Sequence, residues 1–415
     1  MDIASADINR SETTVSQLVL DQNRRRRRLK ESVEGYLFIA PSVLLISLFG
    51  IFPLFFTIYI SAHRWRLRKG ELIGLSNFAE LSGGLLWPLV LVAGIAALVT
   101  AGILLGKVRE RARAQRVGGA APNTAPRILG WIIVAVGIAA IAIALPQIWD
   151  LGDDDMLKSL RITIWYAVGT VPIQLAFGLL LAVLLDQRFK GRQFFRVIFL
   201  LPYIVPTVAS AAIFQVLFSL RPESFANQLI AVFGASPLEW LGERDGVFMM
   251  FFNWGAGDAV TTIGEYWQGW LQGPSLALVS VMIFNYWVYI GYYALIYSNG
   301  LANIPRQLYE AAEVDGASKR TVLWKIIVPL LSPTTFFLTL LGVIGTFKSF
   351  NSLYVLRNPS TGGATDTMSL YIFFTFFRRS RFGYAAAMAL VLFALVLGLT
   401  FLQRRLMERR IHYGD

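Results

Sequence analysis

The sequence predicts an all-α membrane protein, a bundle of about eight transmembrane helices, for three reasons. Hydrophobic residues make up 55% of the chain and charged residues only 15%, which is more apolar than a typical soluble domain. The apolar residues gather in stretches of the length that a helix needs to cross a bilayer, about 20 residues. The Lys and Arg residues cluster at the ends of these stretches, as they do in the cytoplasmic loops of membrane proteins.

The composition excludes several kinds of chemistry. The chain has no cysteine and only two histidines, His63 and His412, so we expect no disulfide framework and no metal site. The net charge of +12 is explained by basic residues that face headgroups and the cytoplasm. Because the basic residues are not interleaved with aromatic ones, we expect no nucleic-acid partner.

Eight apolar stretches are long enough to span. The first begins after residue 30 and is too long for a cleaved signal peptide, so it is predicted to be a stable span. In chain order, the predicted spans are 36–62, 85–106, 128–148, 160–185, 194–220, 276–299, 326–350 and 384–402.

Positive charge predicts the orientation of these spans. By the positive-inside rule, both termini and the basic loops are cytoplasmic. In the segment 221–274 six acidic residues outnumber two basic ones, so it is predicted to be an external loop. The basic cluster after the first span is the exception, because this orientation places it outside. The basic cytoplasmic segments are 24–28, 107–116, 188–192, 319–325 and 404–410, and the exception comprises Arg64, Arg66, Arg68 and Lys69.

Two segments read as additions to a core. Residues 1–34 begin with a polar, aperiodic stretch and are predicted to form a cytoplasmic tail. Segment 85–148 holds two spans rich in Ala, Gly and Val, without charge inside them. It is predicted to be an accessory hairpin that packs or anchors, and a role in transport is the alternative. Gly102 and Gly106 are spaced for close helix packing.

A polar element, 301–329, interrupts the chain before the seventh span. Asn303 can cap a helix that begins at Pro305, and Asp315 with Gly316 supplies a turn before a second helical piece. Its alanines allow a partner's backbone to approach, and its carboxylates offer acceptors for basic groups. The element is therefore suited to couple the membrane helices to a soluble protein; a solvated surface helix is the alternative.

The spacing of certain residues in this element is distinctive. They are Glu310, Ala311, Ala312, Asp315, Gly316, Ile326 and Pro329. This pattern resembles the EAA motif of permease subunits in binding-protein-dependent ABC importers, although Val328 stands where that family commonly has Leu. The longer pattern from Ile304 to Pro333 is similar to the sugar-transporting branch, which includes maltose and glycerol-3-phosphate permeases.

The resemblance covers 34–66 and 160–410, including the first core span (35–66) and a transmembrane core (160–410) with its external loop and EAA loop. Six family spans plus the inserted hairpin account for the eight. Short segments elsewhere also resemble this branch: 38–42, 199–202, 346–351, 361–367 and 383–387.

The resemblance implies a permease in a bacterial or archaeal cytoplasmic membrane that imports a sugar or related polyol. It implies four partners: a second permease subunit, two cytoplasmic ATPase subunits and an external binding protein. This chain would bind no cofactor and would not be an enzyme, because ATP and Mg belong to the ATPases. A secondary transporter is the alternative, but we find neither internal repeats nor ionisable broken helices for a coupling ion. A membrane-embedded hydrolase would need a catalytic constellation within the spans, and none is evident.

Polar residues inside spans are candidates for the substrate path. Those singled out are Asn285, Tyr286, Tyr289, Tyr293, Lys348 and Asn351. The amide and phenols of the sixth span suit a hydroxyl-rich ligand, and helix packing is the alternative. For Lys348 the alternative is to extend to the outer headgroups.

The external loop 221–274 contains four tryptophans among acidic residues, Trp240, Trp254, Trp267 and Trp270. They are consistent with a membrane-interface belt. The alternative is a docking surface for the binding protein in the middle of the loop.

Overall fold

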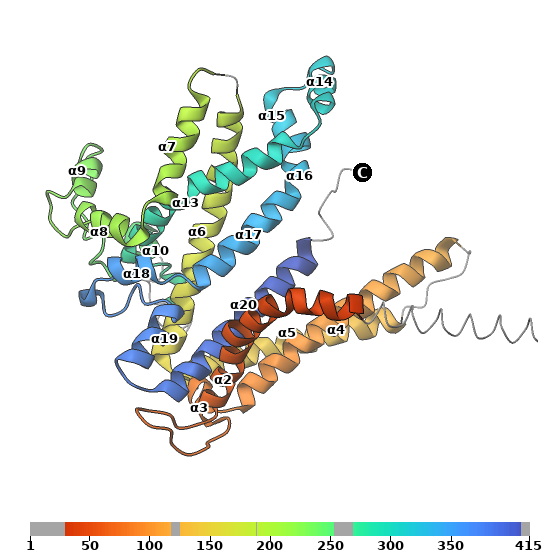
Figure 1. Cartoon of the computed structure of the whole chain (residues 1–415), viewed down its shortest axis with the longest axis vertical. Coiled ribbons are helices and arrows are strands. Elements are labelled where there is room, and N and C mark those ends of the chain that lie inside the picture. Colours follow the sequence, from red (N-terminus) through yellow and green to blue (C-terminus); the bar gives the residue numbers. More distant parts are fainter. Residues whose placement is uncertain (1–29, 118–124, 188, 253–268, 408–415) are drawn as a thin grey trace, which may run out of the picture. The chain divides into compact units, whose positions relative to one another are not determined.

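The computed structural model describes residues 30–117, 125–187, 189–252 and 269–407 (Figure 1). The predicted tail therefore lies almost wholly outside the described residues. The chain divides into two units, up to Ile60 and from Ser61 onward, and each is described by itself. In the described residues every regular element is a helix, and β-structure is limited to isolated bridges.

The described part of the first unit is one helix, Lys30–Ser61, whose last residue is the first of the second unit. It begins at Lys30, so residues 30–34 belong to the helix and not to the predicted tail. A π-helical turn, η1 (Ser47–Ile51), precedes α2 (Phe52–Ser61). Pro53 explains this turn, because proline has no N–H to donate and its ring crowds the carbonyl four residues earlier.

The second unit contains the remaining helices. In order they are α3 (Ser76–Ser82), α4 (Leu86–Val117), α5 (Ala125–Leu151), α6 (Asp154–Asp186), α7 (Arg192–Ile204), α8 (Thr207–Leu217), α9 (Phe225–Ala231), α10 (Val247–Phe252), α13 (Leu276–Ala302), α14 (Arg306–Val314), α15 (Lys319–Val322), η2 (Leu323–Ile327), α16 (Val328–Leu330), α17 (Ser332–Phe347), α18 (Asn351–Leu356), η3 (Pro359–Thr361), α19 (Met368–Phe377) and α20 (Phe382–Met407).

The predicted spans correspond to six long apolar helices and two bent pairs in the described chain. The fifth span is not one helix: α7 and α8 meet at 92°. Val205 is extended (ψ 139°), because the following Pro206 disfavours the helical conformation of its neighbour. The seventh span bends by 66° before α17, where Pro333 has no N–H for the carbonyl four residues earlier.

The accessory hairpin consists of α4 and α5, which pack along each other. Their close approach uses Gly94 and Gly137: a Cβ on either would lie 3.0 Å from the carbonyl oxygen of the other. Gly102 and Gly106, whose spacing would permit close helix packing, do not contact α5 closely, since a Cβ at either meets nothing within 4 Å among the described residues. Small residues do allow α4 to approach α5 closely, but the spacing of Gly102 and Gly106 did not identify the face of α4 that contacts α5.

The core is built around α6 and α13, which pack along their length, with α7 and α17 against them. Glycines permit the close contacts. A Cβ at Gly291 of α13 would lie 1.7 Å from the Phe199 carbonyl oxygen of α7, and one at Gly178 of α6 would lie 2.6 Å from the Cβ of Tyr293. Tyr166 and Tyr297 are fully buried between these helices.

Candidate coupling site

The coupling element begins with α14, which lies beyond the ends of α13 and α17 in Figure 1. Pro305 occupies the position before its first residue, with φ −59° and ψ 131°, and supplies no side-chain cap. The predicted cap by Asn303 is wrong. Asn303 instead ends α13 in a helical conformation, and its N–H donates to the carbonyl of Gly300 at 3.2 Å.

One side of α14 packs on the membrane helices. Ala312 is buried, and Tyr309 packs against a cluster that includes Ile304, Ile327 and Leu331. Burial raises the pKa of the Tyr309 phenol, and the carboxylate of Asp186 raises it further. The α6–α7 connection therefore lies beside the coupling element.

The other side of α14 is free to meet a partner. Glu310, Ala311, Glu313 and Asp315 are all exposed. A carboxylate at such a position can accept charge-assisted bonds from basic groups, and the neighbouring alanine leaves room for a close approach.

Gly316 closes α14 with a Schellman motif. Its φ is +68°, its N–H donates to Glu313 at 3.0 Å, and the N–H of Ala317 donates to Ala312 at 2.9 Å. These are the two bonds that define the motif, in which glycine is favoured because a left-handed conformation is required. The predicted turn is confirmed. A Cβ here meets nothing within 4 Å in the described chain, so conformation and not crowding explains the glycine.

The second half of the element leads into the bent seventh span. Ser318 caps α15 by accepting from the N–H of Thr321 at 3.2 Å. Ile326 lies in the π-helical η2, and Pro329 lies in α16, so the motif residues join α14 to the bent seventh span. A single π turn of this kind often marks a functional site.

The exposed surface of this element is apolar as well as acidic. Val314 is 88% exposed and Trp324 is 61% exposed. Neither residue belongs to the EAA motif. The presence of a tryptophan, Trp324, in a polar loop was the sequence signal that could have identified this surface. Large exposed apolar side chains beside unpaired helix faces are typical of protein–protein contacts.

The candidate path residues of α13 are engaged in helix packing. Nδ2 of Asn285 donates to the hydroxyl of Tyr166, and the backbone carbonyl of Asn285 accepts from Gln174 at 3.1 Å. The hydroxyl of Tyr286 donates to the carbonyl of Gly169 at 2.8 Å. These contacts hold α13 against α6, which favours the packing alternative for both residues.

Tyr289 and Tyr293 turn towards other helices. The Tyr289 ring meets Tyr203 of α7 edge-on, with centroids 5.6 Å apart. The hydroxyl of Tyr293 donates to the Leu338 carbonyl of α17 at 3.4 Å. The four polar residues of α13 therefore contact three different helices in the described chain, and their place in a substrate path stays a prediction.

Lys348 and Asn351 are exposed at the turn between α17 and α18. The fully buried Tyr166 connects this turn to α13, since its hydroxyl interacts with Ser349 and Ser352 as well as with Asn285. Tyr166 was missed by the sequence analysis because an aromatic residue in an apolar span carries no local signal of its role.

Two tryptophans of the external loop are packed within the chain. Nε1 of Trp240 donates to Asn227 at 2.9 Å, and its ring lies 5.5 Å from that of Phe218. Trp270 packs on Trp149 and Trp165. Trp240 is half-buried and packs within the chain, and the docking surface in the middle of the loop stays a prediction. Trp254 and Trp267 lie outside the described residues.

Comparisons with known proteins agree with this arrangement. Residues 174–412 match the family model described as the binding-protein-dependent transport system inner membrane component. The chain is 30% identical over 267 residues to the sn-glycerol-3-phosphate transport system permease protein UgpA of Rhizobium meliloti, covering 64% of this chain and 80% of that protein. It is 29% identical to the trehalose/maltose transport system permease protein MalF of Thermococcus litoralis, covering 58% and 70%.

Among solved structures, a similar fold occurs in a bacterial alginate ABC transporter in complex with a periplasmic protein bound to an alginate pentasaccharide. The TM-score is 0.51 at 17% identity, and the match covers 74% of this chain and 98% of that one. At this identity the likeness shows the fold alone.

Proposed function

The chain belongs to the family of binding-protein-dependent transport system inner membrane components, and on this premise we propose that it is the permease subunit of an ATP-driven importer for a sugar or related polyol. The observation that carries the proposal is the coupling element. Its helix, Schellman turn and second helix continue directly into a membrane-spanning helix, within the part of the chain that matches the family.

The substrate class follows from the relatives. Similar permeases are named for sn-glycerol-3-phosphate, for trehalose and maltose, and for arabinooligosaccharides. These solutes share a hydroxyl-rich backbone. We therefore expect a hydroxyl-rich solute as the substrate of this chain. The external binding protein would deliver it.

The coupling step uses rigid connections. The exposed face of α14 with Glu310 would dock into an ATPase subunit, while Ala312 and Tyr309 fix the opposite face to the α13 and α17 ends. A displacement of α14 is then transmitted through η2 and α16 to the 66° bend before α17. ATP hydrolysis takes place on two such ATPase subunits, with Mg, and this chain binds neither.

The remaining partner is a second permease subunit, which would complete the pore with this chain. Both termini and the coupling element would face the cytoplasm of a bacterial or archaeal cell. In this orientation the acidic loop between α8 and α13 faces the binding protein.

The test is reconstitution. The full chain is purified with the proteins that accompany it in mild detergent, the complex is placed in liposomes, and a panel of binding proteins loaded with sugars, polyols and amino acids is added outside. We expect ATP hydrolysis and uptake with a hydroxyl-rich solute. Uptake driven by an ion gradient without ATP would refute the importer assignment, and stimulation only by an amino acid would refute the substrate class.

A further inference from the structure

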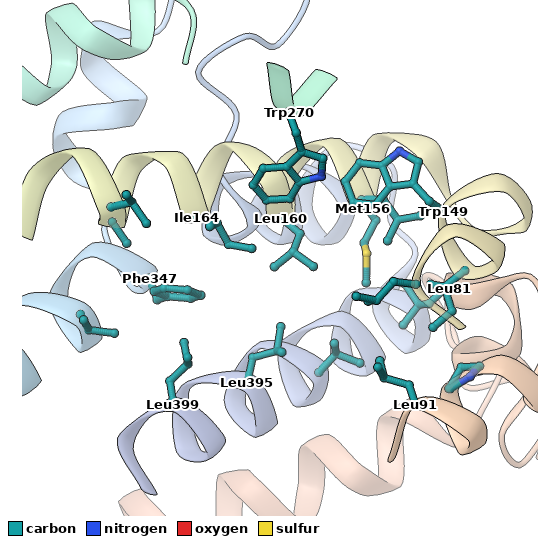
Figure 2. Close-up of a pocket in the computed structure, with 18 of the residues that line it drawn as sticks. Leu81, Leu91, Trp149, Met156, Leu160, Ile164, Trp270, Phe347, Leu395 and Leu399 are labelled. Carbon is teal, nitrogen blue, oxygen red and sulfur yellow. The ribbon is translucent and has the colours of Figure 1, made fainter. Parts of the chain in front are cut away.

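An apolar cavity of about 790 Å³ lies between the accessory hairpin and the core. In Figure 2, Leu395 and Leu399 of α20 face Leu160 and Ile164 of α6 across this space, and Leu91 of α4 approaches from the hairpin side. We call it the hairpin groove. The inserted segment contributes to it, because α4 and α5 together with the preceding α3 supply one wall and core helices supply the others.

The hairpin groove is long. Its lining runs along α6 from Met156 to Leu175, which at about 1.5 Å per residue is about 28 Å. This length is close to the hydrocarbon thickness of a bilayer, about 30 Å.

The apolar lining selects the kind of occupant. A hydrocarbon chain suits such walls, because its carbons make dispersion contacts with them at about 4 Å. Water is unsuited, because a buried water needs two or more polar partners and the lining is almost entirely apolar.

One end of the groove has the character of a membrane–water interface. The rings of Trp149 and Trp270 line it, with centroids 6.3 Å apart. The guanidinium carbon of Arg161 lies 5.7 Å from the centroid of Trp149. Indoles favour the headgroup level of a bilayer, and a cation beside them is placed to meet a phosphate.

We propose that the hairpin groove binds a phospholipid, with one acyl chain between α6 and α20 and its phosphate beside Arg161. The lipid fills the space that the inserted hairpin would otherwise leave between itself and the core. The hairpin is then held to the core by a shared lipid as well as by the direct contacts near α3.

The test uses a photoactivatable phosphatidylglycerol with a diazirine on one acyl chain, added to membranes that contain the full chain. We expect labelled peptides from α6 and α20 in the wild type. Leu395→Trp should lose this label, because the indole fills the groove. The matched control is Leu397→Trp on the same helix, which does not line the groove and is 57% exposed; it should keep the label. Ile164→Phe repeats the test from the opposite wall with a smaller increase in volume.

Equal labelling of Leu395→Trp and wild type, or equal loss in both tryptophan variants, would overturn the proposal. A second measurement uses the absence of cysteine from the chain: a single Leu395→Cys is labelled with a thiol-reactive photocrosslinker, and a crosslink from it to residues 30–61 or to another protein would show that protein fills the groove. The phosphate is tested by a diacylglycerol probe with the same diazirine chain. Wild type should prefer the phospholipid probe and Arg161→Gln should not; an unchanged preference in Arg161→Gln would overturn the headgroup assignment.

Discussion

Replacing Gly316 by valine should uncouple transport from ATP hydrolysis while leaving the protein in the membrane. The residue has φ +68°, a conformation that costs an ordinary L-residue about 1–2 kcal/mol and a β-branched one more. A Cβ there meets nothing within 4 Å among the described residues, so no clash adds to this cost. This conformational cost therefore weakens only the turn held by the two Schellman bonds, which lies outside the transmembrane helices.

The cost is too small to unfold the protein and large enough to change the angle between α14 and α15. In the reconstituted complex we therefore expect normal membrane abundance, retained basal ATPase activity and loss of solute uptake. Gly316→Asn is the first control, because asparagine tolerates the left-handed conformation, and it should preserve most of the uptake.

A second control separates strain from coupling. Gly234 has φ +76° and equally open surroundings, but it follows α9 in the predicted external loop. Gly234→Val should leave uptake intact. Normal uptake by Gly316→Val at normal abundance, or equal loss in Gly234→Val, would refute the reasoning.

Three further outcomes are expected. Glu310→Lys should release the ATPase subunits during purification, because a charge-assisted bond worth about 1.5–3 kcal/mol becomes a repulsion; a stoichiometric ATPase in the mutant complex would contradict this. Asp366→Asn should lower the free energy of unfolding by about 2 kcal/mol, measured as a lower Tm in detergent, since its carboxylate pairs with Arg357 at 2.6 and 2.9 Å and raises the pKa of that guanidinium. Arg357→Lys keeps the positive charge but cannot make both bonds to the Asp366 carboxylate. It should therefore retain only part of the stability that the pair contributes. Gly291→Ala should reduce the folded yield strongly because its Cβ would meet a backbone carbonyl of α7 at 1.7 Å, whereas Gly102→Ala, which meets nothing within 4 Å in the described chain, should be neutral; equal yields would show that α7 can move away.

Much of this protein follows from local sequence. Apolar length alone located the spans, because a helix in lipid must satisfy its own backbone bonds over a fixed thickness. The turn at Gly316 was also predictable, since a left-handed residue after a short helix favours glycine. The bends at Pro206 and Pro333 carried a local signal, because proline restricts the residue before it and has no N–H to donate, although the apolar runs concealed them.

Contacts between distant segments were decided only by the tertiary structure. Small-residue spacing indicated that α4 would pack closely, but the facing helix selected Gly94 and left Gly102 open. The tyrosines of α13 share one helix, yet their partners on α6, α7 and α17 determine that they hold helices together. The hairpin groove has no sequence signal at all, because its walls come from segments up to about 320 residues apart in the chain. Periodicity and turn chemistry act between neighbours in sequence, whereas the partner of a side chain across a helix interface depends on how the helices are placed in space.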